Sequence, residues 1–231
     1  LQAERQAAWG EVARRLAHEI KNPLTPIQLS AERLQHKLSD KLEEKDAQLL
    51  QRATQTIVSQ VAAMKNMVTD FADYARAPPP KLMLLDVHQL INEVMGLYEA
   101  NSSPITLHLE ATRTLVNGDP TRLRQVVHNL LQNAHDALQQ TTYRQIVLST
   151  GNAQDGMLKL TIADNGCGFP EHLLAKAFEP YMTTKPKGTG LGLPIVKKIV
   201  EEHGGKITIE NQAQGGTCVS ILLPLLPQEI E

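Results

Sequence analysis

Residues 188–193 read Gly188-Thr189-Gly190-Leu191-Gly192-Leu193, and the fold of the C-terminal half depends on this stretch, which opens a predicted helix. A glycine-rich loop before a helix presents unpaired N–H groups and the positive end of the helix dipole to an anion. The stretch lacks the Gly-Lys-Ser/Thr ending of a Walker motif and the spacing of a dinucleotide-binding fingerprint. Lys185 and Lys187, just upstream, could reach phosphate oxygens, although each also fits a solvated surface lysine. Alone, the stretch predicts either a phosphate-binding loop or a flexible hinge.

Two further motifs precede this loop in the chain. Asp164-Asn165-Gly166-Cys167-Gly168-Phe169 follows a predicted strand, so its glycines let the backbone approach a ligand closely. The Asp164 carboxylate could accept a hydrogen bond from an exocyclic amine such as that of adenine. Asn129 and Asn133 lie one turn apart on a predicted helix, and their amide oxygens suit Mg²⁺, which bridges substrate phosphates. Alone, the first motif also fits an ordinary turn, and the second fits solvated or capping asparagines.

Strand and helix patterns alternate from Lys81 onward. Period-two alternation of apolar side chains predicts strands, and spacing of three and four residues predicts helices. The predicted strands are 105–109, 158–162, 206–209 and 218–222, and the predicted helices are 87–98, 120–138 and 191–203. Asp119 followed by Pro120 is a favourable start for the second of these helices. We therefore expect a mixed α/β domain.

The N-terminal third predicts only helices. Two stretches with apolar residues at helical spacing flank a charged segment, 39–46, which we expect to be a linker. The first stripe comprises Val12, Leu16, Ile20, Ile27, Ala31, Leu34 and Leu38, and the second comprises Leu50, Ala53, Ile57, Val61, Met64, Val68, Phe71 and Ala75. Two helices bury little by themselves, so we expect an antiparallel hairpin that forms a dimeric four-helix bundle with a second copy. Pro78-Pro79-Pro80 ends the second helix and predicts a boundary between domains 1–77 and 78–231.

One histidine of the first helix has neighbours suited to chemistry. His18 lies off the apolar stripe, so we expect it to be exposed. Glu19 could accept the proton of one imidazole nitrogen while the other nitrogen attacks an electrophile. Asn22, one turn on, could orient a water for the reverse hydrolysis, and Pro23 removes a backbone hydrogen bond and loosens the helix there. A lone exposed histidine is more commonly just a solvated side chain.

Composition narrows the class of protein. The 231 residues are 42% hydrophobic and 21% charged, which is enough apolar material for a core. A net charge of −2 and 3% aromatic residues argue against nucleic-acid or anionic-membrane binding, and no apolar run is long enough to cross a bilayer. The isolated Cys167 and Cys218 exclude a disulfide scaffold and suit a reducing compartment. Because the chain begins with Leu1, we expect a cytoplasmic fragment, whose preceding part could include a sensor or an inner-membrane anchor.

Taken together, the motifs resemble those of the sensor histidine kinases. Residues 129–133, 164–169 and 188–193 resemble the N, G1 and G2 boxes that these kinases share with Hsp90-type chaperones and MutL-type repair proteins. Residues 178–181 resemble the F box. Residues 17–29 are similar to the H box, above all to that of the nitrogen-regulation (NtrY) type. The resemblance covers nearly all of the chain, with five motifs in the order of the family.

The resemblance implies an α+β architecture and a set of site residues. The hairpin would form the dimeric bundle, and an α/β sandwich with a mixed sheet would bind ATP and Mg²⁺. The implied roles are phospho-acceptor for His18, general base for Glu19, phosphatase-assisting amide for Asn22, Mg²⁺-ATP ligation for Asn129 and Asn133, adenine contact for Asp164 with Gly166 and Gly168, and phosphate lid for Gly188, Thr189, Gly190, Leu191 and Gly192. Asp136 stands where many relatives carry a basic residue, so Lys185 or Arg124 is expected to make that phosphate contact instead.

The expected activity is phosphorylation of His18 by ATP and transfer of the phosphoryl group to an aspartate of a response-regulator receiver domain. We expect the ATP-binding domain to swing on the proline linker, and the chain to act as a homodimer without nucleic-acid or membrane contacts. An asparagine at 129, where the chaperone branch usually has a glutamate base, argues against simple ATP hydrolysis. Two alternatives remain: a protein that acts mostly as a phosphatase of its receiver partner, and a non-catalytic dimeric nucleotide-binding scaffold.

Overall fold

The computed structural model describes residues 2–76, 79–98, 105–183 and 189–227. By its internal packing, the chain divides into two compact units. The first comprises Leu1–Pro78 and Thr183–Leu191, and the second comprises Pro79–Met182 and Gly192–Glu231. None of the described helices is long and apolar enough to span a lipid bilayer.

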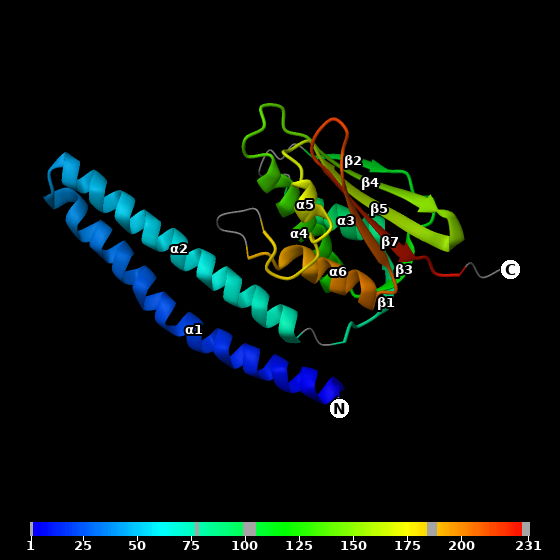
Figure 1. The fold of residues 1–231 in the computed structure, drawn as a ribbon, viewed down its shortest axis with the longest axis horizontal. Helices are drawn as coiled ribbons and strands as arrows, with labels where there is room; N and C mark the ends of the chain where they lie inside the picture. Colours follow the sequence, from blue (N-terminus) through cyan, green and yellow to red (C-terminus); the bar gives the residue numbers. More distant parts are fainter. Residues whose placement is uncertain (1, 77–78, 99–104, 184–188, 228–231) are drawn as a thin grey trace. The chain divides into compact units, whose positions relative to one another are not determined.

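The first unit contains the predicted antiparallel hairpin, which is confirmed (Figure 1, blue to cyan). Helix α1 spans Gln2–Leu38, the short 3₁₀ turn η1 spans Ser39–Lys41, and helix α2 spans Glu44–Arg76. Helix α1 continues through Pro23 and Pro26 without a break. The linker is shorter than predicted, because Glu44 and Asp46 belong to the first turn of α2. Acidic side chains there favour the positive end of the helix dipole, so the charged segment begins a helix instead of only joining two.

Small apolar residues let the two helices approach each other. Ala13, Ala17, Leu24 and Ala31 are buried on α1, and Val61 is buried on α2. Two polar contacts also cross the hairpin. Thr54 Oγ1 donates to Gln35 Oε1 at 3.1 Å, and Lys65 Nζ donates to Gln28 Oε1 at 2.8 Å. These contacts fix the register of α1 against α2.

Most members of the apolar stripe predicted on α1 are not buried by the hairpin. Its exposed members are 41–50% accessible, and two members of the α2 stripe are similarly accessible. These exposed residues, the open apolar face, are Val12, Leu16, Ile20, Ile27 and Leu34 on α1, and Ile57 and Met64 on α2. The predicted stripes therefore contain two sets of residues. One set is buried between α1 and α2, and the other stays exposed in the single chain.

The second unit is built on a mixed five-stranded sheet in the order β2-β4-β5-β7-β6, which confirms the predicted mixed sheet. Strand β2 pairs with β4 in parallel, and the other neighbours are antiparallel. The five strands are β2 (Ile105–Leu109), β4 (Ile146–Ala153), β5 (Met157–Asp164), β6 (Lys206–Asn211) and β7 (Thr217–Pro224). A separate antiparallel pair consists of β1 (Met83–Asp86) and β3 (Leu115–Gly118).

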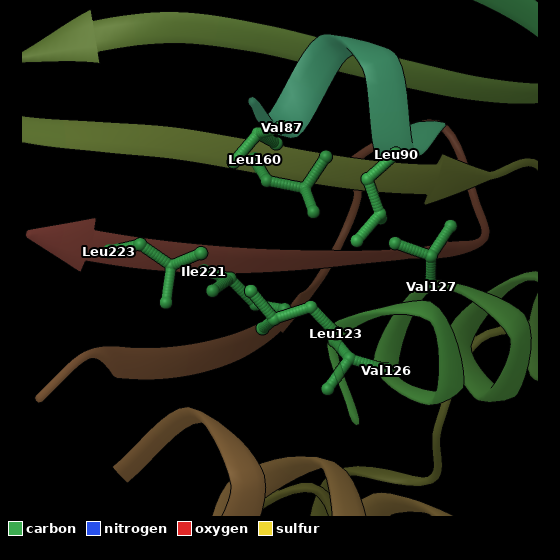
Figure 2. Close-up of a pocket in the computed structure, with 8 residues that line it drawn as sticks. All are labelled: Val87, Leu90, Leu123, Val126, Val127, Leu160, Ile221 and Leu223. Atoms are coloured by element: carbon green, nitrogen blue, oxygen red, sulfur yellow. The ribbon is translucent and has the colours of Figure 1, made fainter. Parts of the chain in front are cut away.

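Helices α3 (Val87–Gly96), α4 (Pro120–Ala137) and α6 (Gly192–Glu202) cover one face of this sheet (Figure 1). The short elements η3 (Gln154–Gly156) and α5 (Glu171–Leu174) complete the described part of the unit. The layers meet in an aliphatic core (Figure 2). A small gap in it is lined by Val87, Leu90, Leu123, Val126, Val127, Leu160, Ile221 and Leu223. With no polar group in its lining, this gap is no candidate for a nucleotide site.

Two aspartates fix the beginnings of the helices that carry this core. The Asp86 carboxylate accepts from the N–H groups of His88 and Gln89 and caps α3. The Asp119 carboxylate accepts from the N–H groups of Thr121 and Arg122 and caps α4, as the sequence predicts. Side-chain capping of this kind satisfies N–H groups that a helix cannot pair internally.

Candidate active site

Asp164 lies at the end of the central strand β5 and is buried. Its Oδ1 atom accepts hydrogen bonds from the N–H of Gly166 at 2.9 Å and from the N–H of Thr217 at 3.3 Å. Two backbone donors from different segments therefore fix the orientation of this carboxylate. Thr217, at the start of β7, is a site residue that the sequence analysis missed.

Both glycines predicted beside Asp164 are needed by the backbone. A Cβ at Gly166 would lie 2.6 Å from the Ala137 carbonyl oxygen, at the end of α4. Gly168 has φ +71°, and a Cβ there would lie 3.1 Å from Asn211 Oδ1. Side chains at these positions would push the loop away from α4 and β6, which explains why the motif needs glycine.

The predicted amide pair lies on α4 of the same unit. Asn129 and Asn133 are half-buried beside the apolar face of the helix. A Cβ at Gly192, the first residue of α6, would lie 3.7 Å from Asn133 Nδ2. The α4–α6 packing thus brings the amide motif to the end of the glycine-rich stretch, as a phosphate-binding site requires.

The amide pair also fits the chemistry of Mg²⁺. Within the described ranges, no group of three or more His, Cys, Asp and Glu side chains could hold a metal ion. Mg²⁺ that binds mainly through nucleotide phosphates and waters needs only one or two protein oxygens. Asn129 and Asn133 supply two amide oxygens one helical turn apart, so the residues present are compatible with such an ion.

The glycine-rich stretch is described from Thr189 onward. Thr189 Oγ1 accepts from the Leu191 N–H at 3.3 Å, Gly190 has φ +66°, and Leu191 is buried. Lys185 and Gly188, both predicted site residues, lie outside the described residues, as does Lys187.

Of Lys185 and Arg124, the two side chains predicted to contact phosphate in place of a basic residue at position 136, only Arg124 lies within the described residues. Arg124 forms an ion pair with Glu93 of α3, with Nη2 2.8 Å from Oε2, and this contact lowers the pKa of Glu93. Asp136, at the position where the resemblance implies a basic residue, accepts from Gln132 Nε2 at 2.9 Å. The Arg124 side chain is therefore engaged with Glu93 in this structure.

The predicted phospho-acceptor group lies on α1. His18, Glu19 and Asn22 are all exposed, as the sequence predicts for His18. Arg15 Nε donates to Glu19 Oε1 at 3.2 Å. This pair at i and i+4 was not anticipated, although its spacing is visible in the sequence. It places a cation on the same helix face as the exposed histidine.

The other histidines described in detail have structural partners. His203 is buried, its Nε2 accepts from the Asp119 N–H at 2.9 Å, and its Nδ1 lies 2.7 Å from the Ile199 carbonyl oxygen. His88 contacts Thr150, and His128 contacts Tyr98. Unlike His18, none of these three combines an exposed ring with a carboxylate next to it in the sequence.

Comparison with known proteins adds two family matches. Residues 8–80 match the family described as "His Kinase A (phospho-acceptor) domain". Residues 118–227 match the family described as "Histidine kinase-, DNA gyrase B-, and HSP90-like ATPase". The first match contains His18, and the second contains Asn129, Asn133 and Asp164.

Curated relatives are similar along most of this chain. An NtrY-like protein of Rickettsia bellii (strain RML369-C) is 38% identical over 221 residues, which cover 95% of this chain and 36% of that protein. Nitrogen regulation protein NtrY of Azorhizobium caulinodans is 37% identical over 221 residues, which cover 93% of this chain and 28% of that protein. The chain thus spans about a third of the length of these relatives.

Solved structures share the fold of both units. The catalytic domain of histidine kinase ThkA is 34% identical, with a TM-score of 0.55, and the match covers 64% of this chain and 99% of that one. Histidine kinase ThkA in complex with the response regulator TrrA is 29% identical, with a TM-score of 0.65. That second match covers 98% of this chain and 65% of the other.

Proposed function

The chain belongs to the sensor histidine kinases, and from this premise we propose that it uses ATP to phosphorylate His18 and passes the phosphoryl group to a response regulator. Residues 1–77 act as the dimerisation and phosphotransfer domain, and residues 78–231 as the ATP-binding domain. Because its substrates are ATP and a receiver protein, this part of the protein works in the cytoplasm.

One observation supports the proposal most directly. An exposed imidazole has a carboxylate beside it on a helix of the first unit, and the second unit contains the aspartate and the amide pair predicted to bind the nucleotide. His18 and Glu19 are adjacent and accessible. Asn133 lies on α4, and the loop that follows Asp164 packs against the end of the same helix. A scaffold without activity would need neither the exposed histidine nor its acidic neighbour.

The chemistry follows from these groups. One nitrogen of His18 attacks the γ-phosphorus of ATP, the bond to the β-phosphate oxygen breaks, and ADP leaves. Glu19 accepts the proton of the other ring nitrogen, which neutralises the imidazolium that forms. Catalysis of phosphoryl transfer depends mostly on positioning and charge stabilisation.

The ATP-binding unit positions the nucleotide at both ends. The Asp164 carboxylate accepts from the exocyclic amine of adenine, and the N–H groups at the start of α6 face the phosphates. Asn129 and Asn133 would hold Mg²⁺ through their amide oxygens, and the ion would supply neutralisation of charge on the phosphate oxygens. The protein side chains then have to orient the γ-phosphate, but they need not balance all of the negative charge of the phosphates by themselves.

The test is labelling with [γ-³²P]ATP and Mg²⁺. The wild-type chain should incorporate label that is lost in acid, since a phosphate on histidine nitrogen is acid-labile and Ser or Thr esters survive. His18→Gln should incorporate none and still bind the ATP analogue AMPPNP. His36→Gln is the matched control, because His36 is exposed near the end of the same helix and should not change labelling. Label retained by His18→Gln would refute the assignment.

Asn22 supports a second activity, removal of the phosphoryl group from the response regulator. Its carboxamide is exposed one turn from His18, where it can orient a water toward a docked phosphoaspartate. With a phosphorylated receiver protein as substrate, Asn22→Ala should slow dephosphorylation much more than autophosphorylation. Asn66→Ala, an exposed asparagine on α2, serves as the control. Equal loss of both activities in Asn22→Ala would exclude this role.

A further inference from the structure

The loop that follows Asp164 is held in place by two side chains from the opposite hairpin. Asn211 ends β6, and Gln212 begins the turn that leads to β7. Asn211 Oδ1 accepts from the Phe169 N–H at 2.8 Å, and its Nδ2 donates to the Phe169 carbonyl at 2.7 Å. Gln212 Nε2 donates to the Asp164 carbonyl at 2.7 Å. One carboxamide therefore secures the far end of the loop, and the other secures its beginning.

The backbone of the loop depends on these anchors. Phe169 is paired with the Asn211 side chain, and the Gly166 N–H is paired with the Asp164 side chain. A strand would use main-chain partners at these positions. Gly168, with φ +71°, leaves room for the Asn211 carboxamide, since a Cβ there would lie 3.1 Å from its oxygen. Gly168, the second glycine of the motif at residues 164–169, and the Asn211 side chain therefore pack directly against each other.

The hairpin also closes tightly on Asp164. A Cβ at Gly216 would lie 1.9 Å from the Asp164 carbonyl oxygen, so the two backbones are in direct contact. The neighbouring Thr217 N–H donates to the Asp164 carboxylate. Gln212 and Thr217 therefore hold the main chain and the side chain of the same residue.

We propose that Asn211 and Gln212 are positioning residues that set the adenine loop, and through it the affinity and base selectivity of the nucleotide site. This inference rests on the proposed function, because it assumes that Asp164 contacts adenine. Without these anchors the loop would sample several conformations, and the carboxylate would meet the exocyclic amine in only some of them. A side chain that is already held in its binding position loses less conformational entropy when the ligand binds.

Asn152 provides a matched control within the same unit. Its Oδ1 accepts from the N–H groups of Thr112 and Arg113 at 2.8 and 3.0 Å, and its Nδ2 donates to the Arg113 carbonyl at 2.9 Å. Like Asn211, it is an exposed asparagine that bridges loop backbone. It lies six residues along β4 from Ile146, the partner of Asp164, and so about 20 Å away from that site. Asn152→Ala loses the same kind of contact without touching the adenine loop.

The experiment uses the full chain with AMPPNP and GMPPNP as probes in titration calorimetry. Asn211→Ala should bind AMPPNP about tenfold more weakly and leave GMPPNP affinity unchanged, because only the base contact is lost. The isosteric Asn211→Asp should lose a similar amount, since its carboxylate cannot donate to the Phe169 carbonyl. In autophosphorylation, the KM for ATP should rise about tenfold and kcat at saturation should stay within twofold. Asn152→Ala should behave as wild type.

The outcomes separate the two proposals. A wild-type chain that binds no AMPPNP would overturn the proposed function, and this inference with it. Wild-type binding together with unchanged affinity in Asn211→Ala would overturn only the role of the anchors. Equal losses in Asn211→Ala and Asn152→Ala would also overturn it, because they would reflect general loosening of the unit.

Discussion

Glu19 offers the sharpest test of the chemistry at the level of a single residue. Replacing the carboxylate with an amide in Glu19→Gln removes the proton acceptor and nearly preserves the shape. General-base catalysis contributes typically 10²–10⁴-fold, so autophosphorylation should slow by about that factor at saturating ATP. AMPPNP affinity should not change, because Glu19 belongs to the hairpin. Initial rates of label incorporation give the measurement.

Glu32→Gln is the matched control for this variant. Glu32 accepts from Gln28 Nε2 at 2.9 Å at the same i and i+4 spacing as the Arg15–Glu19 pair, and it is exposed on the same helix. Its neighbours in the sequence are Ala31 and Arg33, and it lies far along the helix from His18, so the rate of Glu32→Gln should match that of the wild type. A Glu19→Gln chain that labels as fast as Glu32→Gln would remove Glu19 from the mechanism.

Asp119 makes the second unit sensitive to acid. Burial opposes its charged form, but hydrogen bonds from the N–H groups of Lys81, Arg122 and Thr121 outweigh this, so its pKa is lowered. A carboxylate with a lowered pKa stabilises the fold above its unfolded pKa of about 3.9, and this stabilisation is lost as the pH falls through the folded value.

Asp119→Asn should therefore have a flatter pH dependence of stability than the wild type below about pH 4. Asparagine can still accept at the helix cap, so the variant should fold at neutral pH. Calorimetric melting temperatures measured from pH 7 down to pH 3 would check this. If the melting temperatures of the wild type and the variant fall in parallel below pH 4, Asp119 is not a source of the acid sensitivity.

At this scale the sequence predicts the proposed reacting and binding groups better than the side chains that hold them in place. His18 and Asp164 were recognisable from adjacent residues. Asn211 and Gln212 were not, because their partners lie 42 and 48 positions away and are backbone atoms. Only the pairing of β7 with both β5 and β6 brings them together.

Among the secondary-structure elements, the sequence predicted long, strongly patterned segments and missed short ones. Helices α3, α4 and α6 and strands β2, β5, β6 and β7 lie where the periodicity placed them. Strands β1 and β3 have four residues each, too few to display an alternation. Strand β4 was missed although it alternates buried and half-buried residues. Its side chains lie in the middle of the sheet, so its intermediate positions are also apolar or small.

The sheet-to-helix core should dominate the stability of the second unit. Leu160 on β5 is 3% exposed and faces α3 and α4 across the aliphatic core (Figure 2). Leu160→Ala should lower the free energy of unfolding of this unit by about 2–5 kcal/mol. Leu97→Ala makes the same chemical change where the side chain is 73% exposed, and should cost no more than about 0.5 kcal/mol. Urea titrations of both variants would compare them, and equal midpoints would contradict this account of the core.

For the whole molecule, the open apolar face of the hairpin favours association with a second copy. A row of half-exposed aliphatic side chains on both α1 and α2 is costly in water, and a second hairpin would cover both rows at once. The periodicity could predict the stripes but not their division into an inner and an outer face. That division depends on which small residues let α1 and α2 approach, and Ala17 and Ala31 do so here.

The dimer proposal therefore predicts that a charge on this face will separate the subunits. Ile57 is 42% exposed on α2, and Ile57→Glu would place a carboxylate in the interface, where burial of an unpaired charge is strongly unfavourable. Light scattering should show a dimer for the wild type and a monomer for Ile57→Glu at the same concentration. Gln55→Glu adds the same charge two residues away at an exposed position, outside the apolar stripe, and should stay dimeric. If Ile57→Glu also remains a dimer while its helix content is unchanged, the two subunits must meet through some other surface.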